Sequence, residues 1–237
     1  MTNKLSQVIS TKRIYFLVLN YFLGYMYIYP YILSKLYYSF HLSNEVYDLI
    51  SFFVYLFMIG VSIYCAFPVL KESYYNRPKF KKLFESVLLT FVALYFISAL
   101  SNILVFVLTG LEESVNQNQV IDAFNQNPLL IIFTTIIYAP IVEEIVFRGA
   151  IFRGLRSKTN FVTAAIISGL LFGFIHVFDS LVNGNFLDLL YIFVYGSLGF
   201  VFCYSYEKNN SIYASMALHF INNFIGIIGI ILTSFTA

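Results

Sequence analysis

Three short motifs in apolar stretches of this chain bring together the side chains that a hydrolytic reaction needs. They read EEIVFR at 143–148, FGFIH at 172–176 and HFINN at 219–223. An ionisable side chain inside a lipid-embedded helix costs about 3 kcal/mol or more, so it marks a functional site by default. Carboxylates and imidazoles can activate water, and imidazole and amide N–H groups can stabilise an oxyanion. The motifs therefore indicate hydrolysis inside a membrane.

The first motif gives its two carboxylates different neighbours. Glu144 and Arg148 are four residues apart, so they share a helix face and can form an ion pair that locks helices together. Glu143 lies about 100° around the helix, with Phe147 on its face, and has no such partner. We therefore expect Glu143 to be a general base. Pro140, one turn earlier, removes a backbone hydrogen bond and predicts a kink with room for water.

The second motif places an aromatic ring and a histidine on one helix face. Phe172 and His176 are four residues apart. Gly169 and Gly173 have the same spacing, which allows another helix to approach closely. A single intramembrane histidine more often bridges helices than catalyses a reaction, so His176 gains weight only from the other motifs.

The third motif combines an imidazole with two amides. His219 and Asn223 share a helix face and could donate to an oxyanion, whereas Asn222 fits a polar clamp between helices. Chance rarely puts a carboxylate, two imidazoles and an amide at helical spacing on three of four consecutive helices.

Composition determines which elements must position these groups. Of 237 residues, 59% are hydrophobic and 11% are charged, against about 25% charged in soluble domains. Mean hydropathy is +0.79. These values predict an all-α, polytopic transmembrane helical bundle. The expected spans are 14–34, 46–70, 83–110, 128–155, 160–178, 186–206 and 211–235.

The charge pattern excludes a nucleic-acid partner and suggests an orientation. Net charge is only +2, and the sequence has no basic stripe. Basic loops such as 71–82 alternate with loops free of Lys and Arg such as 111–127, which predicts a cytoplasmic N-terminus. Many Ile, Phe, Tyr, Asn and Lys are typical of low-GC bacteria, so we expect a bacterial plasma membrane. Cys65 and Cys203 are expected to be small buried hydrophobes.

The motifs divide the chain in two. Residues 1–127 are expected to be accessory transmembrane helices, and residues 128–237 a catalytic-type core formed by the last four spans. Counted from the cytoplasmic end of each span at about 1.5 Å per residue, the motif residues lie at different depths, from roughly 12 Å for His219 to roughly 25 Å for His176. Tilted helices are therefore needed to bring the motifs together. The loop 111–127 is either a short amphipathic helix or a solvated loop. Its apolar residues at helical spacing are Val120, Ile121 and Phe124.

Together the motifs resemble a known family. APIVEEIVFRG at 139–149, Phe172-x-x-x-His176 and His219-x-x-x-Asn223 look like the signature motifs of the CPBP intramembrane proteases. This CAAX-protease and bacteriocin-processing group is also called the Abi family, and it includes the type II CAAX prenyl endopeptidases. The resemblance covers about 110 residues, 128–235.

The resemblance implies an endopeptidase that cleaves a peptide or a membrane protein within the lipid bilayer. Glu143 and His176 would activate water. His219 and Asn223 would hold the oxyanion. The supporting residues would be Glu144, Arg148 and Phe172. A non-catalytic bacteriocin-immunity or partner-binding protein is the alternative; a transporter is less favoured, because no repeat is visible.

The resemblance also implies a choice of mechanism, since the family has been described both as metalloproteases and as glutamate-type proteases without a catalytic metal. The sequence lacks His-Glu-x-x-His, and Asn223 beside His219 suits an oxyanion role, so we favour no cofactor. The alternative is a divalent metal such as zinc. Its three protein ligands would be Glu143, His176 and His219.

Overall fold

The computed structural model describes residues 7–234, and all regular structure in that range is helical. The α-helices are α1 (Thr11–Leu19), α2 (Tyr29–Phe40), α3 (Asn44–Asn76), α4 (Phe80–Thr109), α5 (Val115–Gln126), α6 (Pro128–Phe133), α7 (Ala139–Glu143), α8 (Arg153–Arg156), α9 (Phe161–His176), α10 (Phe178–Val182), α11 (Tyr191–Asn209) and α12 (Ile212–Ser234). Three π-helical segments, η1 (Asn20–Ile28), η2 (Thr134–Tyr138) and η3 (Glu144–Phe152), and one 3₁₀ turn, η4 (Asp188–Leu190), complete the list.

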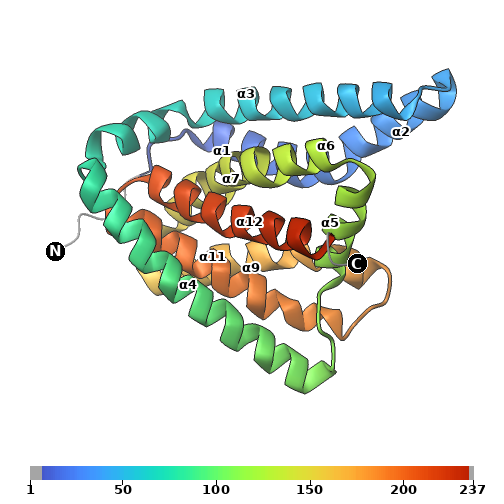
Figure 1. Ribbon diagram of the computed structural model, residues 1–237. Helices are drawn as coiled ribbons and strands as arrows, with labels where there is room; N and C mark the ends of the chain where they lie inside the picture. Colours follow the sequence, from blue (N-terminus) through green and yellow to red (C-terminus); the bar gives the residue numbers. More distant parts are fainter. Residues whose placement is uncertain (1–6, 235–237) are drawn as a thin grey trace.

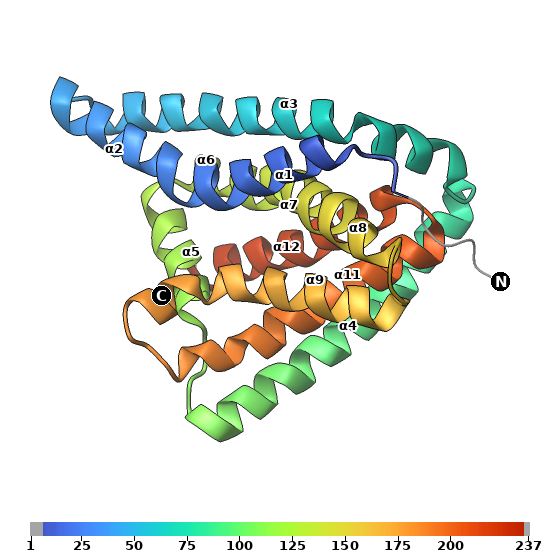
Figure 2. The ribbon, with the colours of Figure 1, turned by 180° about the vertical axis from the view of Figure 1, so that it is seen from behind.

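The helices form one bundle with α12 near its centre (Figure 1). The first helical segment, Thr11–Phe40, is made of α1, η1 and α2, and it lies beside α3 along one edge. α4 crosses obliquely over α11. Seen from behind, α9 lies along α11 on the side away from α4 (Figure 2). The segment from α6 to α8 runs between these layers and contacts α1, α3, α9 and α12, so its polar side chains are enclosed by helices.

The predicted class, a polytopic helical membrane protein, is confirmed. Six helical segments in the described range are long and apolar enough to cross a bilayer. They are Thr11–Phe40, Asn44–Asn76, Phe80–Thr109, Pro128–Arg156, Asp188–Asn209 and Ile212–Ser234. The remaining expected span, 160–178, corresponds to α9, which has 16 residues and is therefore about 24 Å long, short of the ~30 Å hydrocarbon core.

Glycines bring α9 and α11 into close contact, as the sequence predicted for this pair. A Cβ added at Gly173 would lie 2.5 Å from the carbonyl oxygen of Ile192, and one at Gly169 would lie 2.6 Å from that of Gly196. Real Cβ atoms do not approach so closely, so α9 can hold this position only with glycine there. The contact fixes the helix that ends at His176.

The helix that carries both glutamates is wider than a regular α-helix on both sides of Pro140. η2 precedes the proline and η3 follows Glu143, with the short α7 between them. π-helical turns inside α-helices often occur at functional sites. π-helical turns therefore flank Pro140, and the kink expected there stays a prediction.

The loop before this helix is itself partly helical. α5 begins after Ser114, whose side chain accepts a hydrogen bond from the backbone N–H of Gln117. Val120, Ile121 and Phe124 pack on a small buried cluster formed by Ile136, Ile227 and Ile230. The predicted amphipathic helix is confirmed, and the alternative of a solvated loop is wrong for these residues.

Candidate active site

The three motifs meet at one cavity of about 360 Å³. Its walls come from η2, α9, α11, α12 and α5, together with two tyrosines of the N-terminal region, Tyr25 and Tyr55. The predicted residues that line it are Glu143, His176, His219, Asn223 and Phe172. Helices that cross obliquely thus bring together side chains whose counted depths differ.

Glu143 is 7% exposed and uses only one carboxylate oxygen for hydrogen bonding. The hydroxyl of Tyr21 donates to Oε1 at 2.9 Å. Within residues 7–234, Oε2 is buried and has no hydrogen-bond partner. Nε2 of His219 lies 3.9 Å from Oε2. Oε2 is thus the oxygen free to accept a proton.

Glu144 is fully buried and connects two helices. Its Oε1 lies 3.2 Å from Nη1 of Arg148, which is the expected ion pair, and 3.0 Å from Nδ1 of His219. An ionised carboxylate only accepts hydrogen bonds, so Nδ1 carries the proton and Nε2 is directed toward Glu143. Arg148 also donates to the carbonyl of Gly199 on α11, 3.1 Å away. The pair therefore orients His219 and joins three helices.

His176 ends α9, and its Nδ1 lies 2.8 Å from the carbonyl oxygen of Phe172. A carbonyl can only accept, so Nδ1 carries the hydrogen and Nε2 presents its lone pair. The imidazole stacks on Tyr195 with ring centroids 4.4 Å apart and planes at 21°. The hydroxyl of Tyr195 bonds Ser114 at 2.6 Å and Asn116 at 3.2 Å. His176 is therefore linked through Tyr195 to the start of α5.

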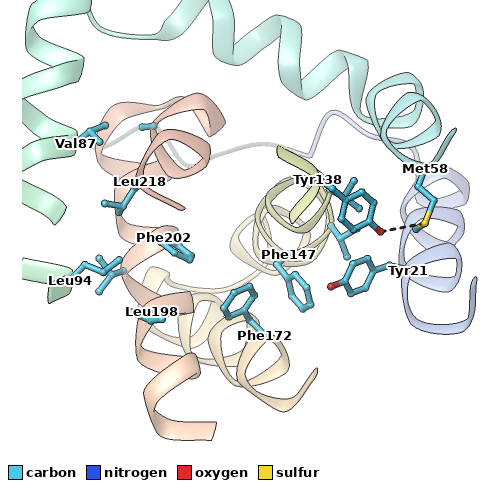
Figure 3. Close-up of a cluster of buried hydrophobic side chains, with 14 residues drawn as sticks. Tyr21, Met58, Val87, Leu94, Tyr138, Phe147, Phe172, Leu198, Phe202 and Leu218 are labelled. Atoms are coloured by element: carbon cyan, nitrogen blue, oxygen red, sulfur yellow. Dashed lines mark hydrogen bonds between the residues drawn. The ribbon is translucent and has the colours of Figure 1, made fainter. Parts of the chain in front are cut away.

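Aromatic rings separate the two imidazoles from the surrounding lipid-facing helices. The ring of Phe172 packs near both, with centroids 4.6 Å from His176 and 5.8 Å from His219. Phe202 stacks on His219 at 4.7 Å. Figure 3 shows Phe172, Phe202 and Phe147 together with Tyr21 in the buried cluster beside the cavity. These rings limit the orientations open to each imidazole.

Asn223 makes the contact between helices that was expected of Asn222, and its oxyanion role stays a prediction. Asn223 donates from Nδ2 to the carbonyl of Thr135 at 2.9 Å, and so clamps α12 to η2. Asn222, for which a clamp was expected, donates to Oδ1 of Asn223 at 3.1 Å. The sequence could not separate them because adjacent residues differ only by 100° in direction, and the position of the neighbouring helix decides. Asn223 retains a second N–H on Nδ2.

Sequence reasoning missed the contribution of the region before residue 128. Tyr21 on η1 bonds Glu143, and Asn116, Gln117 and Val120 of α5 line the cavity. No local signal distinguishes Tyr21 among twenty tyrosines. The division at residue 127 stays a prediction, but the candidate site extends across it.

A metal was the alternative for the same side chains. In the described range, no group of three or more His, Cys, Asp and Glu is arranged to hold a metal ion. Of the three expected ligands, His219 has Nδ1 bonded to Glu144, which leaves its Nε2 as the nitrogen that could bind a metal. Cys65 and Cys203 are free and buried in the apolar core, as expected.

Comparison with known proteins gives a family for the part of the chain that carries the motifs. Residues 125–225 match the model of the type II CAAX prenyl endopeptidase Rce1-like family. This segment is similar to that family. The family expected from the motifs is thus confirmed over nearly the stretch on which the resemblance was based.

Two relatives are similar over about half of the chain. One, from Bacillus subtilis, is named "Putative membrane peptidase YdiL" and is 33% identical over 133 residues, 56% of this chain and 50% of the relative. The other, an "Uncharacterized protein" of Mycoplasma capricolum subsp. capricolum, is 33% identical over 122 residues, 48% of this chain and 33% of the relative. The chain thus matches half or less of each relative's length. No solved structure matches it.

Proposed function

We propose that this protein is an intramembrane endopeptidase that hydrolyses a peptide bond of a peptide or membrane-protein substrate. The observation that carries the proposal is Glu143, which lines a cavity of about 360 Å³ together with two imidazoles and whose buried Oε2 has no hydrogen-bond partner among residues 7–234. An unpaired carboxylate oxygen in a buried site costs stability, which a catalytic role accounts for. The Rce1-like family match and the relative named as a membrane peptidase support the same class of reaction.

In the proposed reaction, Oε2 of Glu143 takes a proton from water while the water oxygen attacks the carbonyl carbon of the substrate. Nε2 of His176, with its free lone pair, accepts a hydrogen bond from the same water. The carbonyl π electrons move to oxygen, and this oxyanion is held by an N–H of Asn223 and by Nε2–H of His219, whose ring is doubly protonated in the proposed reaction, with Nδ1–H on Glu144. When the C–N bond breaks, protonated Glu143 returns its proton to the leaving amine.

Glu144 and Arg148 support these steps without touching the substrate. Glu144 accepts from Nδ1 of His219, so it stabilises that ring when Nε2 also carries a proton and can donate to the oxyanion. Arg148 holds Glu144 in place from the fully buried side. Phe172 fixes the spacing of both imidazoles.

Glu143→Gln tests the proposal, because it nearly preserves shape and removes the base. Quantitative mass spectrometry would compare peptides and membrane proteins from cells that produce the wild type, Glu143→Gln, or Glu85→Gln. Glu85 is exposed on α4 and lies outside the cavity. We expect cleavage products in the wild type and Glu85→Gln only. The same peptides in Glu143→Gln cells would favour a non-catalytic immunity or partner-binding role.

We further propose that hydrolysis needs no metal ion. The sequence supports this, since it lacks His-Glu-x-x-His and Asn223 beside His219 suits an oxyanion role better than a ligand role. Purified protein should keep its cleavage activity in excess chelator and contain no zinc in stoichiometric amount by elemental analysis. One tightly held zinc, lost together with activity in His176→Ala, would overturn this mechanism. The cytoplasmic N-terminus and the bacterial plasma membrane remain part of the proposal.

A further inference from the structure

Resting on the proposed function, the geometry points to Tyr21 as a positioning residue for the general base. Tyr21 lies on η1, 122 positions before Glu143 in sequence, and its hydroxyl donates to Oε1 of Glu143 at 2.9 Å. This is the hydrogen bond that the described structure gives to that carboxylate. It comes from the N-terminal part of the chain, which lies outside the segment matched by the family model.

The tyrosine ring is held from several sides, so the hydroxyl has a defined position. Tyr21 is 1% exposed. Its ring meets Phe147 edge-on at 5.6 Å and 84°, and stacks on Tyr25 at 5.4 Å and 30°. Figure 3 shows Tyr21 beside Phe147, with its hydroxyl on the side that faces the Phe147 ring. Because Phe147 is four residues after Glu143, one helix provides both the contact for the ring and the acceptor for the hydroxyl.

The bond decides which oxygen of Glu143 does the chemistry. A phenol has one proton to donate, and here Oε1 receives it. Rotation of the carboxylate would break this bond, so Oε2 keeps its position 3.9 Å from Nε2 of His219, where it has no hydrogen-bond partner in the described chain. A base held in one orientation loses less entropy on reaching the transition state. Tyr21 thus acts on the reaction through Glu143 and has no contact with the substrate in this proposal.

A smaller chamber on the same side strengthens the assignment. A cavity of about 120 Å³ is lined by both Tyr21 and Glu143, together with His176, Ile175 and Asn116 among others. It is polar and large enough for water, which needs two or more polar partners to be held there. Tyr21 therefore borders the space from which a water molecule can reach both Glu143 and His176.

Tyr21→Phe is the primary test, since it removes one oxygen and keeps the ring packing. The assay uses a fluorogenic peptide spanning a site cleaved by the wild type and not by Glu143→Gln. We expect kcat to fall roughly ten- to a hundredfold with KM unchanged, as for loss of a hydrogen bond to a charged group. The pH at which kcat reaches half its maximum should also move. A purely structural role would leave that pH unchanged.

Tyr29→Phe is the matched control. Tyr29 follows η1 directly in the same helical segment, and its hydroxyl bonds Asn20 at 2.5 Å and not Glu143. We expect wild-type kcat, KM and pH profile. Unfolding of all variants is followed with a thiol-reactive dye, because free Cys65 and Cys203 are buried until the protein unfolds.

A second measurement separates positioning from folding. Site-specific incorporation of 3-fluorotyrosine and 3,5-difluorotyrosine at position 21 keeps the ring and the hydroxyl and changes only the donor strength. We expect kcat to change stepwise along this series at constant KM. Wild-type kcat in Tyr21→Phe, or a flat fluorotyrosine series, would overturn the inference while leaving the hydrolase intact. If Glu143→Gln still cleaves, the proposed function itself fails, whatever the result for Tyr21.

Discussion

One helical segment, Pro128–Arg156, carries two groups of buried charges that are treated in opposite ways. At its end, which we call the basic end (Arg153, Arg156 and their partners Glu72 and Glu207), the carboxylates are fully used. Arg153 bonds both oxygens of Glu72 at 2.9 and 2.7 Å, and also the hydroxyl of Tyr206. Arg156 bonds both oxygens of Glu207 through Nε at 2.9 and 2.8 Å.

In the middle of the segment, the charged side chains Glu143, Glu144 and Arg148 are buried, and they form fewer hydrogen bonds than those at the basic end. Glu144 and Arg148 are fully buried. Among the described residues, the buried atoms without hydrogen-bond partners include Oε2 of Glu143, Oε2 of Glu144, and Nε and Nη1 of Arg148. An unsatisfied charge is costly in a dry interior, whereas a saturated pair holds helices together. The comparison suggests that the basic end stabilises the bundle and the middle is kept open for chemistry.

The largest effect expected from this comparison is loss of activity in Glu143→Gln. If Oε2 is the base, kcat should fall roughly a thousandfold or more, because no neighbouring carboxylate is free to replace it. The midpoint of thermal unfolding should stay the same or rise, since an unpaired buried charge is removed. Peptide turnover and dye-reported unfolding would be measured on the same purified sample. A strongly lowered unfolding midpoint would place Glu143 with the structural charges instead.

Glu144→Gln should affect both activity and stability, because Glu144 lies between the two kinds of region. It removes the carboxylate that holds Nδ1 of His219, so kcat should fall about a hundredfold. It also leaves the fully buried Arg148 without its carboxylate, which costs about 3 kcal/mol of unfolding free energy. Denaturant unfolding and turnover test this. Loss of stability with normal turnover per folded molecule would make the pair purely structural.

Glu72→Gln should produce the reverse of the Glu143 result. Arg153 is 1% exposed and would lose an ionised partner, which should lower the unfolding free energy by about 2 kcal/mol; Glu72 is 29% exposed, so solvent screening limits the loss. Turnover per folded molecule should stay within about twofold, since the basic end lies outside the cavity. A hundredfold loss of kcat at unchanged stability would break the distinction between the two regions.

Much of the fold was predictable because hydropathy and helical spacing are local properties. Apolar runs gave six of the seven expected spans, and four-residue spacing gave the Glu144–Arg148 pair and the glycines that admit α11. The exception, α9, stops at His176, because the chain there changes to short helices and turns. Length alone separates it from the spans.

Only part of the candidate site could be predicted from the sequence, because the rest depends on which helices become neighbours. The sequence placed Glu143, His176 and His219 on helix faces but could not give their distances. Tyr21 had no pattern to mark it, since its partner is 122 positions away. The helix clamp is made by Asn223, where Asn222 was expected, for the same reason: which asparagine forms it depends on where η2 lies. Residue spacing specifies a face, and tertiary packing specifies what that face meets.

The smallest expected effect concerns the start of α5, which lines the cavity and which we call its cover. Neutral hydrogen bonds hold this cover in place, whereas ion pairs hold the basic end. The hydroxyl of Tyr195 bonds Ser114 and Asn116 at the start of α5, so Tyr195→Phe frees that end and keeps the stack on His176. Losing neutral hydrogen bonds costs about 1 kcal/mol, which should raise KM several-fold and leave kcat nearly unchanged.

Hydrogen exchange of the backbone amides at 114–117 checks the cause, because a loosened helix start exchanges faster. Tyr213→Phe is the control: its hydroxyl bonds the carbonyl of Leu70 at 3.2 Å, away from the cavity, and it should change neither exchange at 114–117 nor KM. If Tyr195→Phe instead lowers kcat at constant KM, then Tyr195 acts on His176 and not on α5. Tyr195 would then belong to the catalytic group around Glu143, and the contrast with the basic end would include a neutral side chain.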